Sequence, residues 1–141
     1  ISNHDVQRVA TRWGGGEAPE HIASTLTALA CSLRGSICVF QGEELGLTEV
    51  ELPFELLQDP YGIAFWPEFR GRDGARTPMP WRKDRKGAVA GAARPWLPVP
   101  DAHRARAVEI QAANRHSVLA SWRRFLACAR RRKWRTASAS V

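Results

Sequence analysis

The stretch Ile1-Ser2-Asn3-His4-Asp5 places a short apolar start directly before three side chains that form hydrogen bonds. This order is typical of the end of a buried strand that carries polar groups to the rim of a pocket. Taken alone, Asn-His-Asp also occurs at ordinary strand ends and turns, where the side chains bond only to nearby backbone. Its meaning therefore depends on the segments that follow.

The next two segments predict a strand–helix–strand unit. Pro19 starts a run that ends before Gly35 and has apolar residues at helical spacing: Ile22, Leu26, Leu29, Ala30 and Leu33. Directly after it, residues 37–40 are four consecutive apolar residues, the pattern of a short strand buried on both faces of a parallel sheet. In such a unit the carboxyl ends of the strands share one rim, so residues 3–5 and 41–44 should lie together.

Residues 45–100 predict one long, mostly irregular loop that is rich in Trp, Phe, Pro and Arg. Within it we expect one or two helical turns over residues 53–58 and a β-turn over residues 59–62. A long ordered loop usually lines a functional site, and aromatic rings beside Arg and Asp suit contacts with sugars or with nucleobases. An equally consistent interpretation is that the aromatic side chains hold the loop on its own small core.

Two helices are predicted after the loop. The first has Asp101 as its expected N-cap and residues 103–113 as its body, and the second is capped by Ser117. One face of the second helix is apolar: Val118, Leu119, Trp122, Phe125 and Leu126. Its far side and end carry many cations: Arg123, Arg124, Arg130, Arg131, Arg132, Lys133 and Arg135. This pattern predicts either a packed helix with a solvated basic face or a binding module for nucleic acid or another anionic surface, spanning residues 117–135.

The composition is that of an ordinary globular protein, but the charge is unevenly divided. The chain has 141 residues, of which 44% are hydrophobic and 25% charged. Residues 1–80 carry six arginines against eleven acids, a net charge of −5, whereas residues 81–141 carry fifteen Lys and Arg against three acids, a net charge of +12. The chain as a whole is therefore not a uniform polyanion binder. The sequence has no long apolar run and no export signal, so neither a membrane span nor a membrane partner is expected.

The three cysteines, Cys31, Cys38 and Cys128, lie in apolar contexts. They show no CxxC spacing and no histidine at metal-ligand spacing. We predict buried free thiols in a reducing compartment, and we expect neither a metal site nor a cofactor.

Four segments, in this order along the chain, resemble glycoside hydrolase family 13 of the α-amylase superfamily, and within it the bacterial α-glucosidase and oligo-1,6-glucosidase branch. They lie within residues 1–127 and read NHDVQRVATRWG, SLRGSICVFQGEELGL, LPFELLQDPYGIAFWPEFRGRDGARTPMPW and RPWLPVPDAHRARAVEIQAANRHSVLASWRRFLA. The string GRDGARTPMPW is the most specific of these matches.

The resemblance implies an α/β fold, namely an incomplete C-terminal part of a (β/α)₈ TIM barrel with the long loop between the eighth strand and the closing helix. Residues 3–5 would end the seventh strand, residues 19–34 would form the seventh helix, and residues 37–40 the eighth strand. Residues 1–135 would belong to this catalytic domain, and residues 136–141 to a disordered tail.

The resemblance also implies the chemistry. In this family a carboxylate nucleophile attacks the anomeric carbon while a carboxylic acid releases the leaving group, with retention of configuration. Asp5 would be the third carboxylate, the catalytic residue that grips sugar hydroxyls and stabilises the transition state. The implied substrate-binding residues are His4 and Arg72, and those implied to support the rim are Asn3, Arg8 and Glu44.

The resemblance places the nucleophile and the general acid on the fourth and fifth strands, which this sequence lacks. Glu43, Glu44 and Asp73 stand near the expected rim, but no spacing places a carboxylate pair about 5 Å apart, as retention requires. We therefore expect part of an α-glucosidase acting on α-linked glucose of oligosaccharides, inactive alone and dependent on the N-terminal barrel half as its partner.

Two alternatives stay open: the basic binding module and an inactive remnant. For the glucosidase we expect no nucleic-acid partner and a location in the bacterial cytoplasm.

Overall fold

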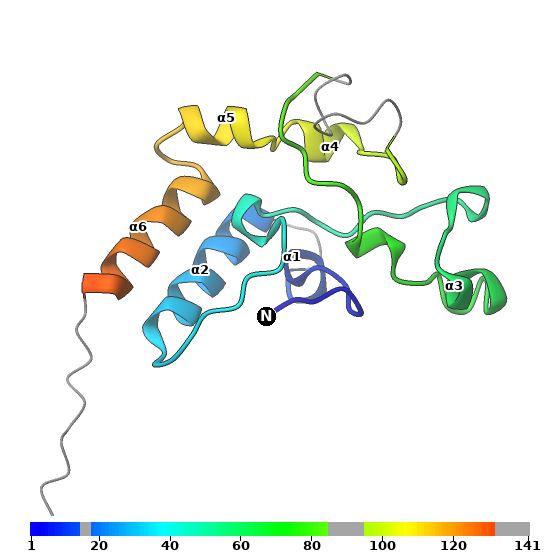
Figure 1. Cartoon of the computed structure of the whole chain (residues 1–141), viewed down its shortest axis with the longest axis horizontal. Helices are drawn as coiled ribbons and strands as arrows, with labels where there is room; N and C mark the ends of the chain where they lie inside the picture. Colours follow the sequence, from blue (N-terminus) through cyan, green and yellow to red (C-terminus); the bar gives the residue numbers. More distant parts are fainter. Residues whose placement is uncertain (15–17, 85–94, 132–141) are drawn as a thin grey trace, which may run out of the picture.

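The computed structural model describes residues 1–14, 18–84 and 95–131, and in these ranges it contains helices and loops without a strand. Figure 1 shows α2 and α6 side by side, with the long loop and α3 extending to the opposite side of the molecule. In chain order the elements are α1 (Val9–Arg12), α2 (Pro19–Ser32), η1 (Glu43–Leu45), η2 (Phe54–Leu56), α3 (Pro60–Ala64), η3 (Asp73–Ala75), α4 (Asp101–Arg104), α5 (Val108–Ala113) and α6 (Val118–Arg131).

Helix α2 confirms the helix predicted over residues 19–34. It begins at Pro19, whose fixed φ and missing N–H suit the first turn. The buried side differs in part from the predicted apolar face, because Leu29 and Leu33 are 52% and 62% exposed. The side chains buried instead are small or short: Pro19, Ala23, Thr27 and Cys31. Their four-residue spacing gives α2 a narrow buried stripe, along which Ala23 packs on α6.

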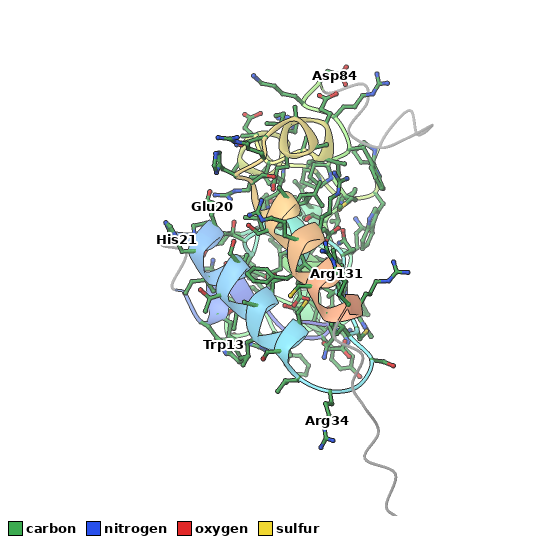
Figure 2. All side chains as sticks on the ribbon, turned by 90° about the vertical axis from the view of Figure 1, so that its left-hand side faces the viewer. Trp13, Glu20, His21, Arg34, Asp84 and Arg131 are labelled. Carbon is green, nitrogen blue, oxygen red and sulfur yellow. The ribbon has the colours of Figure 1, made fainter. Side chains whose placement is uncertain are left out.

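Helix α6 confirms the predicted apolar face and its cap. Val118 and Trp122 are buried against Ala23 of α2 in one core cluster, and Leu126 packs on this cluster. Ser117 is the N-cap, since its Oγ accepts a hydrogen bond from the Ala120 N–H at 3.1 Å. Figure 2 shows α2 and α6 running alongside each other, with Arg131 at the last turn of α6.

The strand predicted over residues 37–40 is not formed within the described ranges. A strand requires a ladder of hydrogen bonds to a neighbouring strand, and no described segment supplies one. The Phe40 backbone instead bonds locally, since its N–H donates to Glu43 Oε2 at 3.3 Å and its carbonyl accepts from the Glu43 N–H at 3.1 Å. Val39 is 38% exposed, so burial on both faces is not achieved either.

Three predictions, two for the helix after the loop and one for the loop itself, were wrong in detail. The helix predicted over residues 103–113 is divided into α4 and α5, because the Val108 N–H donates to the Pro80 carbonyl at 2.9 Å rather than to the preceding turn. Asp101 is the first residue of α4, and the N-cap is Pro100. The β-turn predicted over residues 59–62 is the start of α3.

The helical turn predicted over residues 53–58 is confirmed by η2. The prediction of buried cysteines holds for Cys31 alone, because Cys38 and Cys128 are exposed. Cys38 lies in the segment that forms no sheet, and Cys128 follows the buried part of α6. The predicted disordered tail, residues 136–141, and the boundary at residue 135 lie outside the described residues. No helix in the described ranges is long and apolar enough to cross a membrane.

His103 is a buried histidine of α4 that the sequence did not single out. Its side chain is held between two loop residues, with Nε2 2.9 Å from the Thr48 carbonyl oxygen and Nδ1 3.4 Å from Thr77 Oγ1. A neutral ring that donates from Nε2 and accepts at Nδ1 satisfies both contacts. Burial, together with the positive charge of Arg8, lowers the pKa of His103 from 6.5 to about 4.

This lowered pKa predicts a loss of stability in mild acid. The unfolded chain binds a proton on His103 below about pH 6.5, whereas the folded chain does so only near pH 4. The histidine therefore destabilises the fold progressively between these values, by roughly 3 kcal/mol in total. Urea unfolding over this pH range measures the effect, and His103→Gln should remove most of it. The matched control is His21→Gln, which removes an exposed histidine of α2 and should retain the loss of stability caused by His103.

The informative quantity is the difference between the unmodified chain and His103→Gln in the pH dependence of the free energy of unfolding. Burial raises the pKa of Glu44 and of Glu49, and these two groups shift stability in the opposite direction as the pH falls. An identical pH dependence for the unmodified chain and His103→Gln would contradict the assignment of a buried neutral His103.

Candidate functional site

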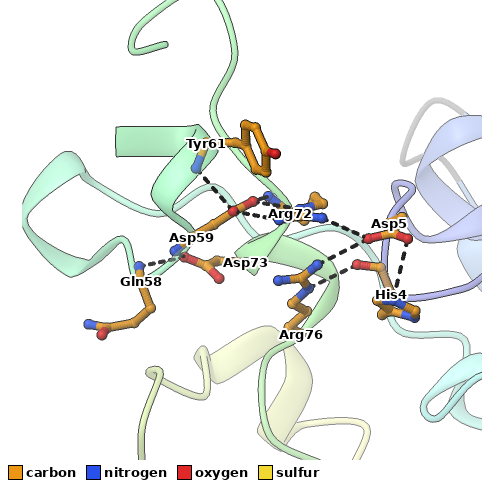
Figure 3. Close-up of polar contacts among 8 residues, drawn as sticks. All are labelled: His4, Asp5, Gln58, Asp59, Tyr61, Arg72, Asp73 and Arg76. Carbon is orange, nitrogen blue, oxygen red and sulfur yellow. Dashed lines mark hydrogen bonds and ion pairs between the residues drawn. The ribbon is translucent and has the colours of Figure 1, made fainter. Parts of the chain in front are cut away.

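Asp5 is the centre of a polar cluster that joins the start of the chain to the long loop (Figure 3). Two arginines bind the same carboxylate oxygen, Asp5 Oδ1: Arg72 Nη1 lies at 3.0 Å and Arg76 Nη2 at 3.2 Å. Arg76 also donates from Nε to the His4 carbonyl at 2.9 Å. The other oxygen, Asp5 Oδ2, lies 3.3 Å from His4 Nε2. The Asp5 side chain is 50% exposed.

Asn3 fixes the turn that presents Asp5. Its Oδ1 accepts a hydrogen bond from the Asp5 N–H at 2.8 Å, which is an Asx-type turn. The structure thus brings together four of the predicted site residues: Asn3, His4, Asp5 and Arg72.

Asp59 holds the guanidinium of Arg72 in a single orientation. Arg72 donates from Nε to Asp59 Oδ2 and from Nη2 to Asp59 Oδ1, both at 2.8 Å, and the Arg72 backbone N–H reaches Oδ2 at 2.8 Å as well. The Arg72 side chain also lies over the Tyr61 ring, 5.2 Å from its centroid. These hydrogen bonds to Arg72 hold the pKa of Asp59 well below its usual range and raise the pKa of Arg72.

Two glycines let the segments carrying Asp59 and Arg72 approach closely. Gly71 has a φ of +78°, and a Cβ on it would lie 2.9 Å from the Gly62 Cα. A Cβ on Gly62 would meet the Gly71 Cα at 2.8 Å. Because these contacts are with backbone atoms, a side chain at either position would force the Asp59–Arg72 pair apart.

Arg8 and Glu44, the other residues implied to support the rim, make their contacts with residues 40–42. Arg8 is buried, donates from Nη1 to the Gln41 carbonyl at 2.7 Å, and lies over the Phe40 ring at 5.5 Å. Burial lowers the pKa of Arg8 to about 10, against the opposing charge of Glu49. Glu44 Oε2 accepts from the Gly42 N–H at 2.8 Å. Both residues thus help to shape the loop of residues 40–44, and neither forms a hydrogen bond or an ion pair with the Asp5 side chain.

The other acids considered for the reaction are already engaged by backbone N–H groups. Glu43 Oε1 accepts from the Ser2 N–H at 2.6 Å. Asp73 is buried, and its Oδ2 accepts from the Gln58 and Asp59 N–H groups at 2.6 and 2.8 Å. Within the described residues neither acid is placed to act with Asp5 on one substrate.

A hollow of about 400 Å³ lies beside Asp5 and Arg72. The rest of its wall comes from Val6, Gln7 and Glu49 and from the loop segment 67–71. A carboxylate and a guanidinium in the wall of such a hollow, with the His4 imidazole 3.3 Å from the carboxylate, can bind hydroxyl groups and stabilise a positive charge. No group of three or more His, Cys, Asp or Glu side chains in the described part of the chain is arranged to hold a metal ion.

Sequence reasoning missed Asp59 and Arg76. The signal for Arg76 was present, because it stands four residues after Arg72 in GRDGARTPMPW. Asp59 precedes Arg72 by thirteen residues and sits at an expected turn, so nothing in the local pattern indicated the pair.

Comparisons with known proteins give a consistent result. The family model for the catalytic domain of alpha amylase matches residues 1–137. A probable alpha-glucosidase of Rhizobium meliloti (strain 1021) is 52% identical over 128 residues, which are 90% of this chain and 23% of that protein. An oligo-1,6-glucosidase of Parageobacillus thermoglucosidasius is 31% identical over 118 residues, 70% of this chain and 21% of that protein. Among solved structures, the alpha-glucosyl transfer enzyme XgtA superposes with a TM-score of 0.87 at 56% identity, covering 94% of this chain and 24% of that chain. The chain thus spans about a quarter of the length of these relatives.

Proposed function

The chain belongs to the family of alpha amylase catalytic domains, and on this premise we propose that it forms the C-terminal part of a retaining α-glucosidase barrel. The barrel would release terminal α-linked glucose from oligosaccharides. The similarity to an alpha-glucosidase and an oligo-1,6-glucosidase supports this reaction class. We also propose that residues 1–5 and 37–40 contribute two strands to the complete barrel.

The main observation in support of the proposal is that two arginines fix the carboxylate of Asp5. Two guanidinium groups, from Arg72 and Arg76, bind Oδ1, and the half-exposed Asp5 side chain lines the hollow. Glycosidic bond cleavage passes through a transition state with positive charge on the sugar ring. A carboxylate fixed in advance stabilises that charge without reorganising during the reaction, and this is the role we assign to Asp5.

His4 and Arg72 would bind the hydroxyl groups of the same sugar. The His4 side chain is 69% exposed and its Nε2 lies 3.3 Å from Asp5 Oδ2, so a sugar hydroxyl that approaches this pair from the exposed side can bond to both. Arg72 is held by Asp59, which would keep its guanidinium in place at the closed end of the site. Asn3, Arg8 and Glu44 would support this wall from behind.

The nucleophile and the general acid would come from segments outside these 141 residues. This part of the proposal is supported by the backbone engagement of Glu43 and Asp73 and by the quarter-length match to the relatives. The location in the bacterial cytoplasm stays a prediction.

The proposal is tested by a chimera, in which this chain replaces the segment that it matches in the Rhizobium alpha-glucosidase. We expect the chimera to hydrolyse an aryl α-glucoside and the isolated chain to show no turnover, because only the chimera unites all three carboxylates. A chimera that folds, as judged by circular dichroism, yet lacks activity would support the inactive remnant. Turnover by the isolated chain would contradict the assignment of the reacting groups to other segments.

A further inference from the structure

Helix α6 has a second, basic face that the proposed glycosidase site does not use. At 100° per residue, Arg123 and Arg130 lie along one edge of this face and Arg124 and Arg131 along the other. Each pair is seven residues apart, so its two members repeat along the axis at about 10 Å. All four side chains are exposed, and between the rows lie only the small side chains of Ala120 and Ala127.

Acids in the described part of the chain do not neutralise these arginines. In the described ranges no carboxylate lies within ion-pair distance of any of the four. Among the described residues, only Arg124 of these four has side-chain hydrogen bonds, donating to the Arg115 carbonyl at 2.7 Å and to Ser121 Oγ at 2.9 Å. Its charge is therefore also left uncompensated.

The opposite face of α6 indicates whether an anionic membrane or a soluble polyanion is the better partner for the basic face. A helix that inserts into an anionic membrane needs a free apolar face. Here Val118, Leu119 and Trp122 are buried against α2 and the region around η1. Phe125 and Leu126, the other large apolar side chains of α6, are partly buried, so the face left outside is mainly basic. Such a face favours a polyanion held by charge and guanidinium hydrogen bonds.

We propose that the basic face of α6, formed by Arg123, Arg124, Arg130 and Arg131, binds the phosphate backbone of nucleic acid without reading its sequence. Guanidinium groups bind phosphate oxygens through paired hydrogen bonds, and exposed arginine rows neutralise neighbouring phosphates. This binding would be independent of the proposed glycosidase activity, since none of these four side chains bonds to the Asp5 cluster.

The test measures the binding of the complete 141-residue chain to a labelled DNA duplex of arbitrary sequence by fluorescence anisotropy at increasing NaCl. We expect binding that weakens with salt, the logarithm of the association constant falling by about 0.9 per phosphate neutralised. For four arginines the slope should be about −3 to −4 or steeper. Arg130→Gln/Arg131→Gln should weaken binding at low salt about tenfold or more and make the slope less steep by about 2.

The matched control is Arg82→Gln/Lys83→Gln, which removes two charges from another adjacent, exposed pair. It should change the affinity less than about twofold, whereas a general effect of net charge would weaken both variants alike. Equal losses in the two variants, or no binding at low salt, would overturn the proposal. Binding to anionic phospholipid vesicles with none to DNA would overturn it as well. Circular dichroism checks that α6 is retained, and glutamine is a good helix former.

Discussion

Asp5→Asn in the chimera is expected to lower kcat by about 10²–10³-fold while the protein stays folded. The substitution keeps the shape of the side chain and removes the negative charge. The charge is what a positively charged transition state requires, and the substrate ground state gains much less from it. The loss should therefore appear mainly in kcat, measured with an aryl α-glucoside.

Asp101→Asn is the control for this prediction. Asp101 is also an aspartate, lies exposed at the first turn of α4 and pairs with Arg104 three residues later. Exposed pairs of this kind contribute little to stability, so this variant should stay within about twofold of the chimera in kcat. If Asp5→Asn retained near-normal kcat, the assignment of Asp5 as transition-state stabiliser would be wrong.

Arg72→Lys is expected to have the second largest effect. Lysine keeps the positive charge but cannot form the two parallel bonds to Asp59 and the third bond to Asp5 at once. Asp5 would then be held by Arg76 alone, and the sugar would lose a positioned donor. Because Asp5 and the donor to the sugar would both be less well positioned, we expect kcat/KM to fall by about 10–100-fold, with an increase in KM.

The loop should lose stability in the same variant, because the carboxylate of Asp59 is buried and loses its paired donors. Arg34→Lys, an exposed arginine after α2, is the matched control and should leave both kcat/KM and the thermal midpoint unchanged (Figure 2). An Arg72→Lys chimera with unaltered KM and kcat would show that the Asp59–Arg72–Asp5 chain is structural only.

The sequence predicted best those elements that are determined within a few residues. Helices α2 and α6 follow from apolar periodicity and from Pro19 and Ser117 at their starts, and both are confirmed. The division of the predicted helix at residues 105–107 depends on the Pro80 carbonyl, which is distant in sequence and not visible in the pattern. The segment 37–40 shows the same limit, since an apolar run forms a strand only where a neighbouring strand completes its hydrogen bonds.

The residues of the candidate site also fall into those that the sequence indicates and those that only the structure reveals. Asn3, His4, Asp5 and Arg72 stand in recognisable strings, and the structure brings them together. Asp59 and Arg76 acquire their roles only through contacts with these residues, across thirteen and seventy-one residues respectively. The basic face of α6 was visible from the sequence, whereas the burial of its opposite face depends on contacts with α2 and η1.

The measurement that tests the account most directly is the location of the covalent glycosyl–enzyme intermediate in the chimera. A retaining enzyme forms this intermediate on its nucleophile, and a fluorinated glucosyl fluoride accumulates it for mapping by peptide mass spectrometry. We predict that the label lies on a carboxylate of the Rhizobium segment, and that Asp5→Asn slows the formation of the labelled intermediate. A label on Asp5, or on any other residue contributed by this chain, would contradict the claim that the chain stabilises the transition state without supplying the nucleophile.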